Sequence, residues 1–181
     1  MKVIGICGSP RKGGNTELMI KNALKRATEV GANTALILSS ERKIELCDGC
    51  LECENTGKCH IKDDMQEIYR KILDCDAIIF SSPVYWNNVT PQMKNFIDRM
   101  NPIASKLTRK IIGVILVGQC KGREKEESHK IAIKWFKDLS RLYHARFAGI
   151  VDASARLPKD IMKHKTSLVS AIKLGEKIAK M

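Results

Sequence analysis

The feature that most constrains the fold of this chain is a regular alternation between short apolar runs and helical patterns. Five apolar runs read as strands, and each is followed by a stretch whose apolar residues recur at helical spacing. The expected strands are residues 2–7, 33–38, 77–80, 111–117 and 145–151. The run at 77–80 is apolar throughout, as in a central parallel strand that is covered on both faces. The alternation predicts a doubly wound α/β sheet with five strands and five helices.

The length of 181 residues is that of a single domain, which we place at residues 1–181. The longest apolar run, Ile111 to Val117, is too short to cross a membrane, and the N-terminal residues read as a strand and not as a signal peptide. We therefore expect a cytoplasmic protein without a membrane partner. Seven cysteines, an odd number, argue against a disulfide framework in a reducing compartment.

Four of the cysteines lie within one stretch of thirteen residues. They are Cys47, Cys50, Cys53 and Cys59, with the spacing C-x2-C-x2-C-x5-C. Two consecutive gaps of two residues resemble the run that ligates a [4Fe–4S] cluster in bacterial ferredoxins. A structural zinc site usually separates two C-x2-C pairs by a longer spacer. The spacing predicts a [4Fe–4S] cluster on these four thiolates, with a zinc ion or a metal-free loop as the alternatives.

The four cysteines lie within residues 44–62. We interpret this segment as a loop inserted between the second strand and the next helix. We expect Gly49 and Gly57 to let the backbone approach the cluster without a β-carbon in the way. Asp64 and Glu67 have the spacing of a capping box, with Asp64 as the N-cap of the helix that follows. The cluster loop would then end where that helix begins.

A glycine-rich turn at residues 8–14 joins the first strand to the first helix. This arrangement presents a helix N-terminus to a phosphate group. The Walker A and dinucleotide-binding motifs are both absent, which leaves a loop suited to a phosphate monoester. We predict that Ser9, Arg11, Asn15 and Thr16 bind that phosphate. The alternative is an ordinary turn in which Asn15 or Thr16 caps the helix.

The third strand runs into an unusual loop that comprises Pro83, Val84, Tyr85, Trp86 and Asn87. Two of the few large aromatic residues of the chain therefore lie between proline, serine and asparagine, where a core is not normally built. Such a loop suits a planar ring system, which packs against apolar side chains and bonds to backbone N–H groups. The alternative is that both aromatic side chains only cover the end of the sheet. Thr90 is expected to cap the next helix, which opens at Pro91.

Distinctive loops follow the first, third and fourth strands, the last of them beginning with Gly118 and Gln119. In the flavodoxin-like strand order 2-1-3-4-5 these three strands are neighbours, and FMN binds at the switch point between strands one and three. We therefore predict an FMN site made by these three loops. We identify no residue that must act as a catalytic acid or base.

The formal net charge of +12 favours anionic cofactors and an acidic electron carrier such as ferredoxin. Nucleic acid is a weaker interpretation, because the basic residues are scattered and aromatic residues make up only 5% of the chain. We expect no nucleic-acid partner. A well-solvated basic surface without a specific partner is the remaining alternative.

Taken together, the motifs show a family resemblance. Residues 8–11, 14–16 and 82–86 are similar to the NADPH-dependent FMN reductase branch of flavodoxin-like proteins. With the four cysteines, the chain resembles the iron–sulfur flavoproteins of anaerobic archaea and bacteria. The resemblance implies FMN, one [4Fe–4S] cluster and electron exchange with ferredoxin. It also implies a homodimer or a tetramer of dimers, in which the cluster of one subunit lies near the flavin of its neighbour.

The resulting interpretation is an FMN-dependent oxidoreductase that carries electrons between a low-potential donor, the cluster and FMN. Two other functions stay open at this point. One is a cluster-free NAD(P)H-dependent reductase of FMN or quinones, in which Lys121 and Arg123 receive the nicotinamide phosphate. The other is a non-enzymatic zinc-knuckle module on a flavodoxin-like scaffold.

Overall fold

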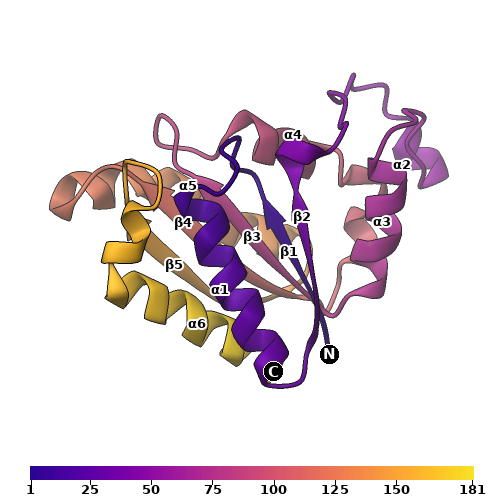
Figure 1. Cartoon of the computed structure of the whole chain (residues 1–181). Coiled ribbons are helices and arrows are strands. Elements are labelled where there is room, and N and C mark those ends of the chain that lie inside the picture. Colours follow the sequence, from indigo (N-terminus) through magenta and orange to yellow (C-terminus); the bar gives the residue numbers. More distant parts are fainter.

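The computed structural model describes all residues, 1–181, as a five-stranded parallel sheet between two layers of helices (Figure 1). The strands are β1 (Lys2–Cys7), β2 (Asn33–Leu38), β3 (Ala77–Pro83), β4 (Ile111–Gly118) and β5 (Arg146–Ser154). Their order is β2-β1-β3-β4-β5, and every neighbouring pair is parallel. The predicted flavodoxin-like sheet is confirmed.

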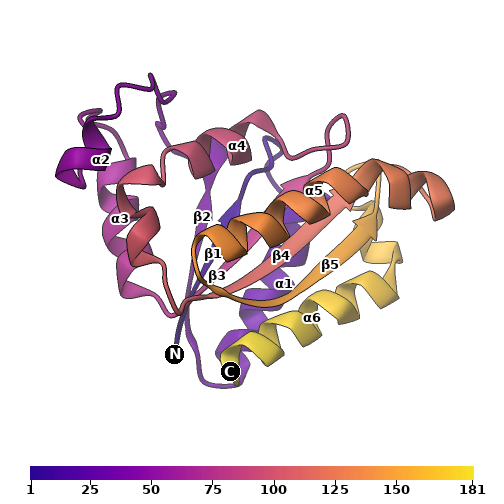
Figure 2. The ribbon, with the colours of Figure 1, turned by 180° about the vertical axis from the view of Figure 1, so that it is seen from behind.

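Helices cover both faces of this sheet. They are α1 (Asn15–Glu29), α2 (Glu52–Thr56), α3 (Met65–Asp74), α4 (Pro91–Asp98), α5 (Gly122–Leu142) and α6 (Lys165–Ala179). Short 3₁₀ turns lie at η1 (Ser39–Glu41), η2 (Asn101–Lys106) and η3 (Asp160–Lys163). Figures 1 and 2 show α1 and α6 on one face and α3, α4 and α5 on the other. Five helices were expected; α2 is an addition inside the cysteine loop, too short to leave a helical pattern in the sequence.

The core consists of two apolar layers, one on each face of the sheet. Phe80, Phe96 and Phe136 belong to the layer under α3, α4 and α5, and Met19 and Ile178 to the layer under α1 and α6. Strand β4 is buried along its whole length. None of the helices combines the length and the apolar character needed to cross a bilayer.

Strands β3 and β5 continue further toward their carboxyl ends than the apolar runs indicated. The ladder between β3 and β4 extends to Pro83 opposite Val117, and that between β4 and β5 extends to Ser154 opposite Gly118. Polar residues such as Ser82 are fully buried in this extension. An apolar pattern does not detect them, because their burial follows from the neighbouring strands and loops.

The two helices on the α1 face approach each other at a glycine. A β-carbon added at Gly175 of α6 would lie 2.0 Å from the carbonyl oxygen of Ala23 in α1. Both Ala23 and Gly175 are buried. The absence of a side chain at position 175 therefore sets the distance between the two helices.

We expect the substitution Gly175→Ala to lower the free energy of unfolding by about 1–3 kcal/mol, because its methyl group overlaps a main-chain oxygen that cannot rotate away. Chemical denaturation measures this change. Lys173→Ala, at an exposed position of the same helix, is the control and should change stability by less than about 0.5 kcal/mol. A Gly175→Ala protein as stable as the parent would contradict the close approach of α1 and α6.

Candidate functional site

A cavity of 1370 Å³ lies at the carboxyl ends of β1, β3 and β4. Its walls come from the loops after these strands, from the N-terminal half of α5 and from residues 155–158. All the residues predicted to bind FMN line it: Ser9, Arg11, Asn15, Thr16, Pro83, Val84, Tyr85, Trp86, Asn87, Gly118 and Gln119. The structure thus brings the three predicted loops together around one space at the topological switch point.

The first wall of the cavity is the N-terminus of α1. The N-cap residue is Gly14, and no side chain caps the helix, so the predicted alternative of an Asn15 or Thr16 cap is not observed. The free N–H groups and the helix dipole favour an anion here. Ser9 and Thr16 are buried beside this end, and the Ser9 hydroxyl accepts the N–H of Arg11 at 3.2 Å. These groups can bind a phosphate.

Asn15 has a structural contact that the sequence did not reveal. Its Nδ2 donates to the carbonyl of Leu157 at 2.8 Å, and its Oδ1 accepts the N–H of Ile161 at 3.1 Å. The side chain therefore holds the 157–161 segment against the start of α1. One N–H of the amide is left for a ligand, so Asn15 contributes less to the predicted phosphate site than its position suggested.

The second wall is a tight hairpin at the end of β3. Tyr85 and Asn88 exchange two backbone hydrogen bonds of 2.7 and 3.0 Å, and the residues between them, Trp86 and Asn87, have φ angles of 47° and 66°. This geometry is that of a type I′ turn. A tryptophan in this region costs about 1–3 kcal/mol, and strain of this kind clusters at functional sites. The Trp86 side chain is fully exposed, so it does not serve as a core residue.

Thr90 connects the two loops that face each other across the switch point. Its buried hydroxyl donates to the carbonyl of Gly8 at 2.6 Å and accepts the N–H of Met93 at 3.2 Å. Its own N–H donates to the hydroxyl of Ser82 at 3.1 Å. The predicted N-cap of α4 is confirmed, and the same residue fixes the loop after β1 to the end of β3.

The structure adds a buried charged group behind the third loop. The Nδ1 of His129 bonds to the Asp152 carboxylate, and the Lys125 ammonium lies 3.1 Å from the other carboxylate oxygen. His129 is fully buried, and its Nε2 has no hydrogen-bond partner. A β-carbon at Gly118 would lie 2.0 Å from this Nε2, which explains the glycine. Sequence reasoning missed the group because its members come from α5 and β5.

The stem of the cysteine loop is closed by two adjacent carboxylates. Asp64 accepts the N–H of Lys43 at 2.9 Å, and Asp63 accepts the N–H of Glu45 at 2.9 Å. Asp64 is the N-cap residue of α3, as predicted, but the capping box itself is wrong: the Asp64 side chain does not cap the helix, and Glu67 pairs with Lys71. The carboxylates bond across the stem instead, where backbone N–H groups of residues 43–45 need acceptors.

A buried ion pair lies beneath this stem. The Arg99 guanidinium contacts Asp63 through two hydrogen bonds of 2.6 and 3.1 Å, and both side chains are at most 1% exposed. Arg99 also donates to the carbonyl of Glu45 at 2.7 Å. Burial raises the pKa of Asp63, but the hydrogen bonds from Arg99 and from the Glu45 N–H outweigh it and hold that pKa below its ordinary value.

The four thiols differ in exposure. Cys47 and Cys50 are exposed, whereas Cys53 and Cys59 are half-buried. The amide nitrogen of Asn101 lies 3.2 Å from the Cys53 sulfur. Four thiols with an N–H donor beside one of them are a donor set that fits an iron–sulfur cluster.

The two glycines of the loop have a conformational role. Gly49 and Gly57 have φ angles of 71° and 66°, which favour glycine. A β-carbon at either position would meet no atom within 4 Å. In this structure both glycines are needed for the backbone turn, and the expected close approach of the backbone to a cluster stays a prediction.

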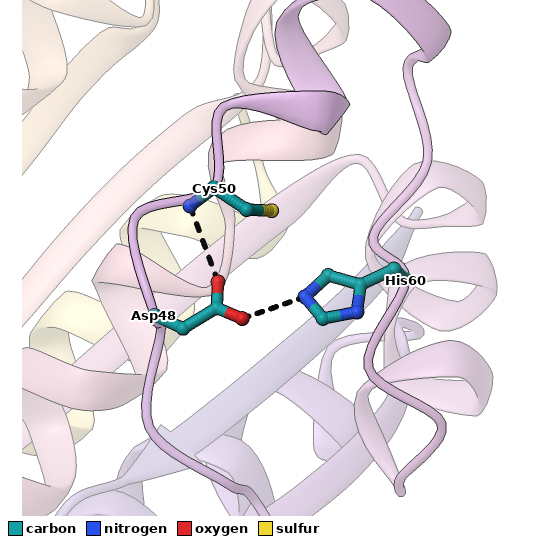
Figure 3. Close-up of side chains that lie close together, drawn as sticks. All are labelled: Asp48, Cys50 and His60. Carbon is teal, nitrogen blue, oxygen red and sulfur yellow. Dashed lines mark hydrogen bonds and ion pairs between the residues drawn. The ribbon is translucent and has the colours of Figure 1, made fainter.

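A hydrogen-bonded trio joins the two ends of the cysteine loop (Figure 3). Asp48 accepts the N–H of Cys50 at 3.2 Å, and its other oxygen lies 2.8 Å from Nε2 of His60. Candidate ligand atoms of all three lie within 4.8 Å of one another, but the side chains are exposed and include only one sulfur. The trio closes the loop, because His60 follows Cys59 directly and Asp48 follows Cys47.

Comparisons with known proteins agree with this geometry. Residues 1–140 match the family model of the NADPH-dependent FMN reductases. The chain is 34% identical to an iron–sulfur flavoprotein of Methanocaldococcus jannaschii, over 100% of this chain and 97% of that protein. It is 36% identical to an iron–sulfur flavoprotein of Methanosarcina thermophila, over 75% of this chain and 72% of that protein.

A solved structure shows the same fold at low sequence identity. The NAD(P)H:quinone oxidoreductase of Methanothermobacter marburgensis superposes with a TM-score of 0.77 at 16% identity, over 98% of this chain and 96% of that one. The fold, the family match and the full-length similarity lead to one conclusion. The chain belongs to the NADPH-dependent FMN reductase family and, within it, to the iron–sulfur flavoproteins.

Proposed function

We propose that this protein is an FMN-dependent oxidoreductase that binds FMN in the cavity and a [4Fe–4S] cluster on Cys47, Cys50, Cys53 and Cys59. The observation that carries the proposal is the coexistence of two sites in one chain. A cavity at the switch point is lined by all three predicted loops, and a loop with four thiols leaves the sheet after β2. The family of the chain supports both cofactors.

Each wall of the cavity has a role in holding FMN. The N-terminus of α1 binds the phosphate, with Ser9 and Thr16 as hydroxyl donors and Arg11 as the nearby positive charge. The ring system lies between the Tyr85–Asn88 hairpin and the Gly118–Gln119 backbone. FMN supplies one-electron and two-electron chemistry, and the protein orients it and excludes water.

A cluster on the four thiolates would supply one-electron chemistry and would accept electrons from an acidic carrier of the ferredoxin type. The net charge of +12 supports such a partner, because opposite charges steer diffusional encounter. The four thiolates would hold the cluster and the cavity would hold FMN, in a homodimer or a tetramer of dimers in the cytoplasm. These statements extend what the family implies to this chain.

The cavity has room for an electron acceptor beside the flavin. Its 1370 Å³ exceeds the roughly 300–1,000 Å³ of typical ligand pockets. The part beyond the three loops is lined by polar residues of α5, including Glu124, Glu127 and Lys130. We propose that the acceptor, a small polar or quinone-like molecule, enters here.

A cluster-free NAD(P)H-dependent reductase is the weaker alternative. It leaves the four thiols without a role, and neither Lys121 nor Arg123 lines the cavity. The two residues expected to receive a nicotinamide phosphate are therefore not at its wall.

Metal and flavin analysis of protein purified without oxygen tests the cluster. We expect about one FMN, and about four irons with equal acid-labile sulfide, per chain. Cys50→Ser should lose the iron and keep the FMN, because Cys50 does not line the cavity. Cys75→Ser, outside the loop and away from the wall of the cavity, is the control and should keep both. FMN without iron after attempted reconstitution would contradict the cluster, and zinc in its place would support the zinc alternative.

Flavin titration of the apoprotein tests the aromatic wall. We expect Trp86→Ala to weaken FMN binding about three- to tenfold, because an aromatic contact contributes about 0.5–1.5 kcal/mol beyond area burial. Stability should not fall, since Trp86 is fully exposed. Leu142→Ala removes another large exposed apolar side chain, which does not line the cavity, and is the matched control. Unchanged affinity in Trp86→Ala would place the ring system elsewhere.

A further inference from the structure

The C-terminal end of α4 reaches the cysteine loop at two points. Arg99 is the C-cap residue of α4, and Asn101 begins the 3₁₀ turn that follows. Arg99 bonds to the stem through Asp63 and Glu45, and Asn101 contacts the sulfur of Cys53. One short segment outside the loop therefore places N–H donors at its base and at one of its thiols.

The buried guanidinium of Arg99 is not fully paired. Its two terminal nitrogens bond to Asp63 and to the Glu45 carbonyl, but Nε is buried without a hydrogen-bond partner. An unpaired buried donor is costly and calls for an explanation. The bonds to the loop stem account for the two terminal nitrogens of the guanidinium, but they do not account for the burial of Nε.

Cys59 is one of the two half-buried thiols of the loop. It packs against the same apolar layer as Tyr69, whose hydroxyl donates to the Arg99 carbonyl at 2.6 Å. Burial lowers the pKa of Arg99, but Asp63, Tyr69 and Cys59 together raise it above its ordinary value. Cys59 also contributes to raising the pKa of Tyr69, after the larger effect of burial. Tyr69 therefore connects the backbone of Arg99 with the apolar layer against which Cys59 packs.

We propose that Arg99 and Asn101 are positioning residues that raise the reduction potential of the cluster, Arg99 as a buried positive charge on the stem of the loop and Asn101 through its contact with Cys53. The inference rests on the cluster of the proposed function. Reduction adds one electron, and hence one negative charge, to the cluster. A fixed positive charge and N–H donors to the sulfurs stabilise the reduced form more than the oxidised form, so they shift the potential upward.

Asp63 acts in the opposite sense. Its carboxylate holds the guanidinium in place, but its negative charge partly cancels the field of Arg99 at the thiolates. Both side chains are at most 1% exposed, so water screens neither charge effectively. Removal of one partner should therefore shift the potential in the direction set by the charge that remains.

A redox titration of the cluster, followed by electron paramagnetic resonance on anaerobically purified protein, tests the proposal. We expect Arg99→Gln to lower the reduction potential of the cluster by about 59 mV. For one electron this corresponds to a tenfold change in the ratio of reduced to oxidised cluster. Asn101→Ala should lower the potential by a smaller amount. Asp63→Asn should raise it.

Arg26→Gln is the matched control. It removes the same charge from an Arg–Glu pair between α1 and α6, on the other face of the sheet, where the Arg26 side chain is 35% exposed. Its cluster potential should match that of the parent. Arg99→Lys keeps the charge and should lie closer to the parent than Arg99→Gln does.

Iron and sulfide analysis separates the two ways in which this experiment fails. A parent protein without iron contradicts the proposed function itself. If the parent holds its cluster and the three variants have the same cluster potential as the parent, the inference is overturned. It is also overturned if Arg99→Gln and Asp63→Asn shift the cluster potential in the same direction. If both variants of the buried pair lose their iron, Asn101→Ala decides, because Asn101 is exposed and its replacement leaves the core intact.

Discussion

The reversal of winding direction at β1 is the constraint on which the rest of this structure depends. The chain leaves β1 toward β2 on one side and later returns to β3 on the other. The loops after β1 and β3 therefore turn away from each other and leave a crevice at the carboxyl edge of the sheet. Because all strands are parallel, the loop after β4 reaches the same edge. The 1370 Å³ cavity is a consequence of the strand order, which places the loops after β1, β3 and β4 around it.

Helix α4 connects this cavity with the cysteine loop. At its start, Thr90 bonds to the carbonyl of Gly8 beside the cavity, and at its end Arg99 bonds to the stem of the cysteine loop. A helix of eight residues is about 12 Å long, so the two sites lie at the ends of one short rigid element. Removing one partner of the buried Arg99–Asp63 pair would leave an uncompensated charge, which costs about 3–5 kcal/mol, so both residues are needed at this junction.

Charge placement distinguishes the two sites. The start of α1 offers backbone N–H groups and a helix dipole to a phosphate, and the buried Glu17 carboxylate accepts the Gly13 N–H just before the helix. The cysteine loop has a buried guanidinium at its base and a hydrogen-bonded Asp48–His60 pair across its ends. His129, held by Asp152, is a third buried polar group, and it fills the space that a side chain at position 118 would need.

Local patterns in the sequence determined the five strands, the five main helices and the distinctive loops after β1, β3 and β4, because each depends on periodicity or on a loop at a strand end. The cavity wall that comes from α5 and from residues 155–158 appeared only in the tertiary structure. Tertiary structure alone decided how the polar side chains pair. Asn15 binds the 157–161 segment, Asp63 and Asp64 bond across the loop stem in place of a helix cap, and Arg99 and His129 are buried by partners distant in sequence. A polar side chain bonds to whichever donor or acceptor the fold brings within about 3 Å, and no local spacing specifies that partner.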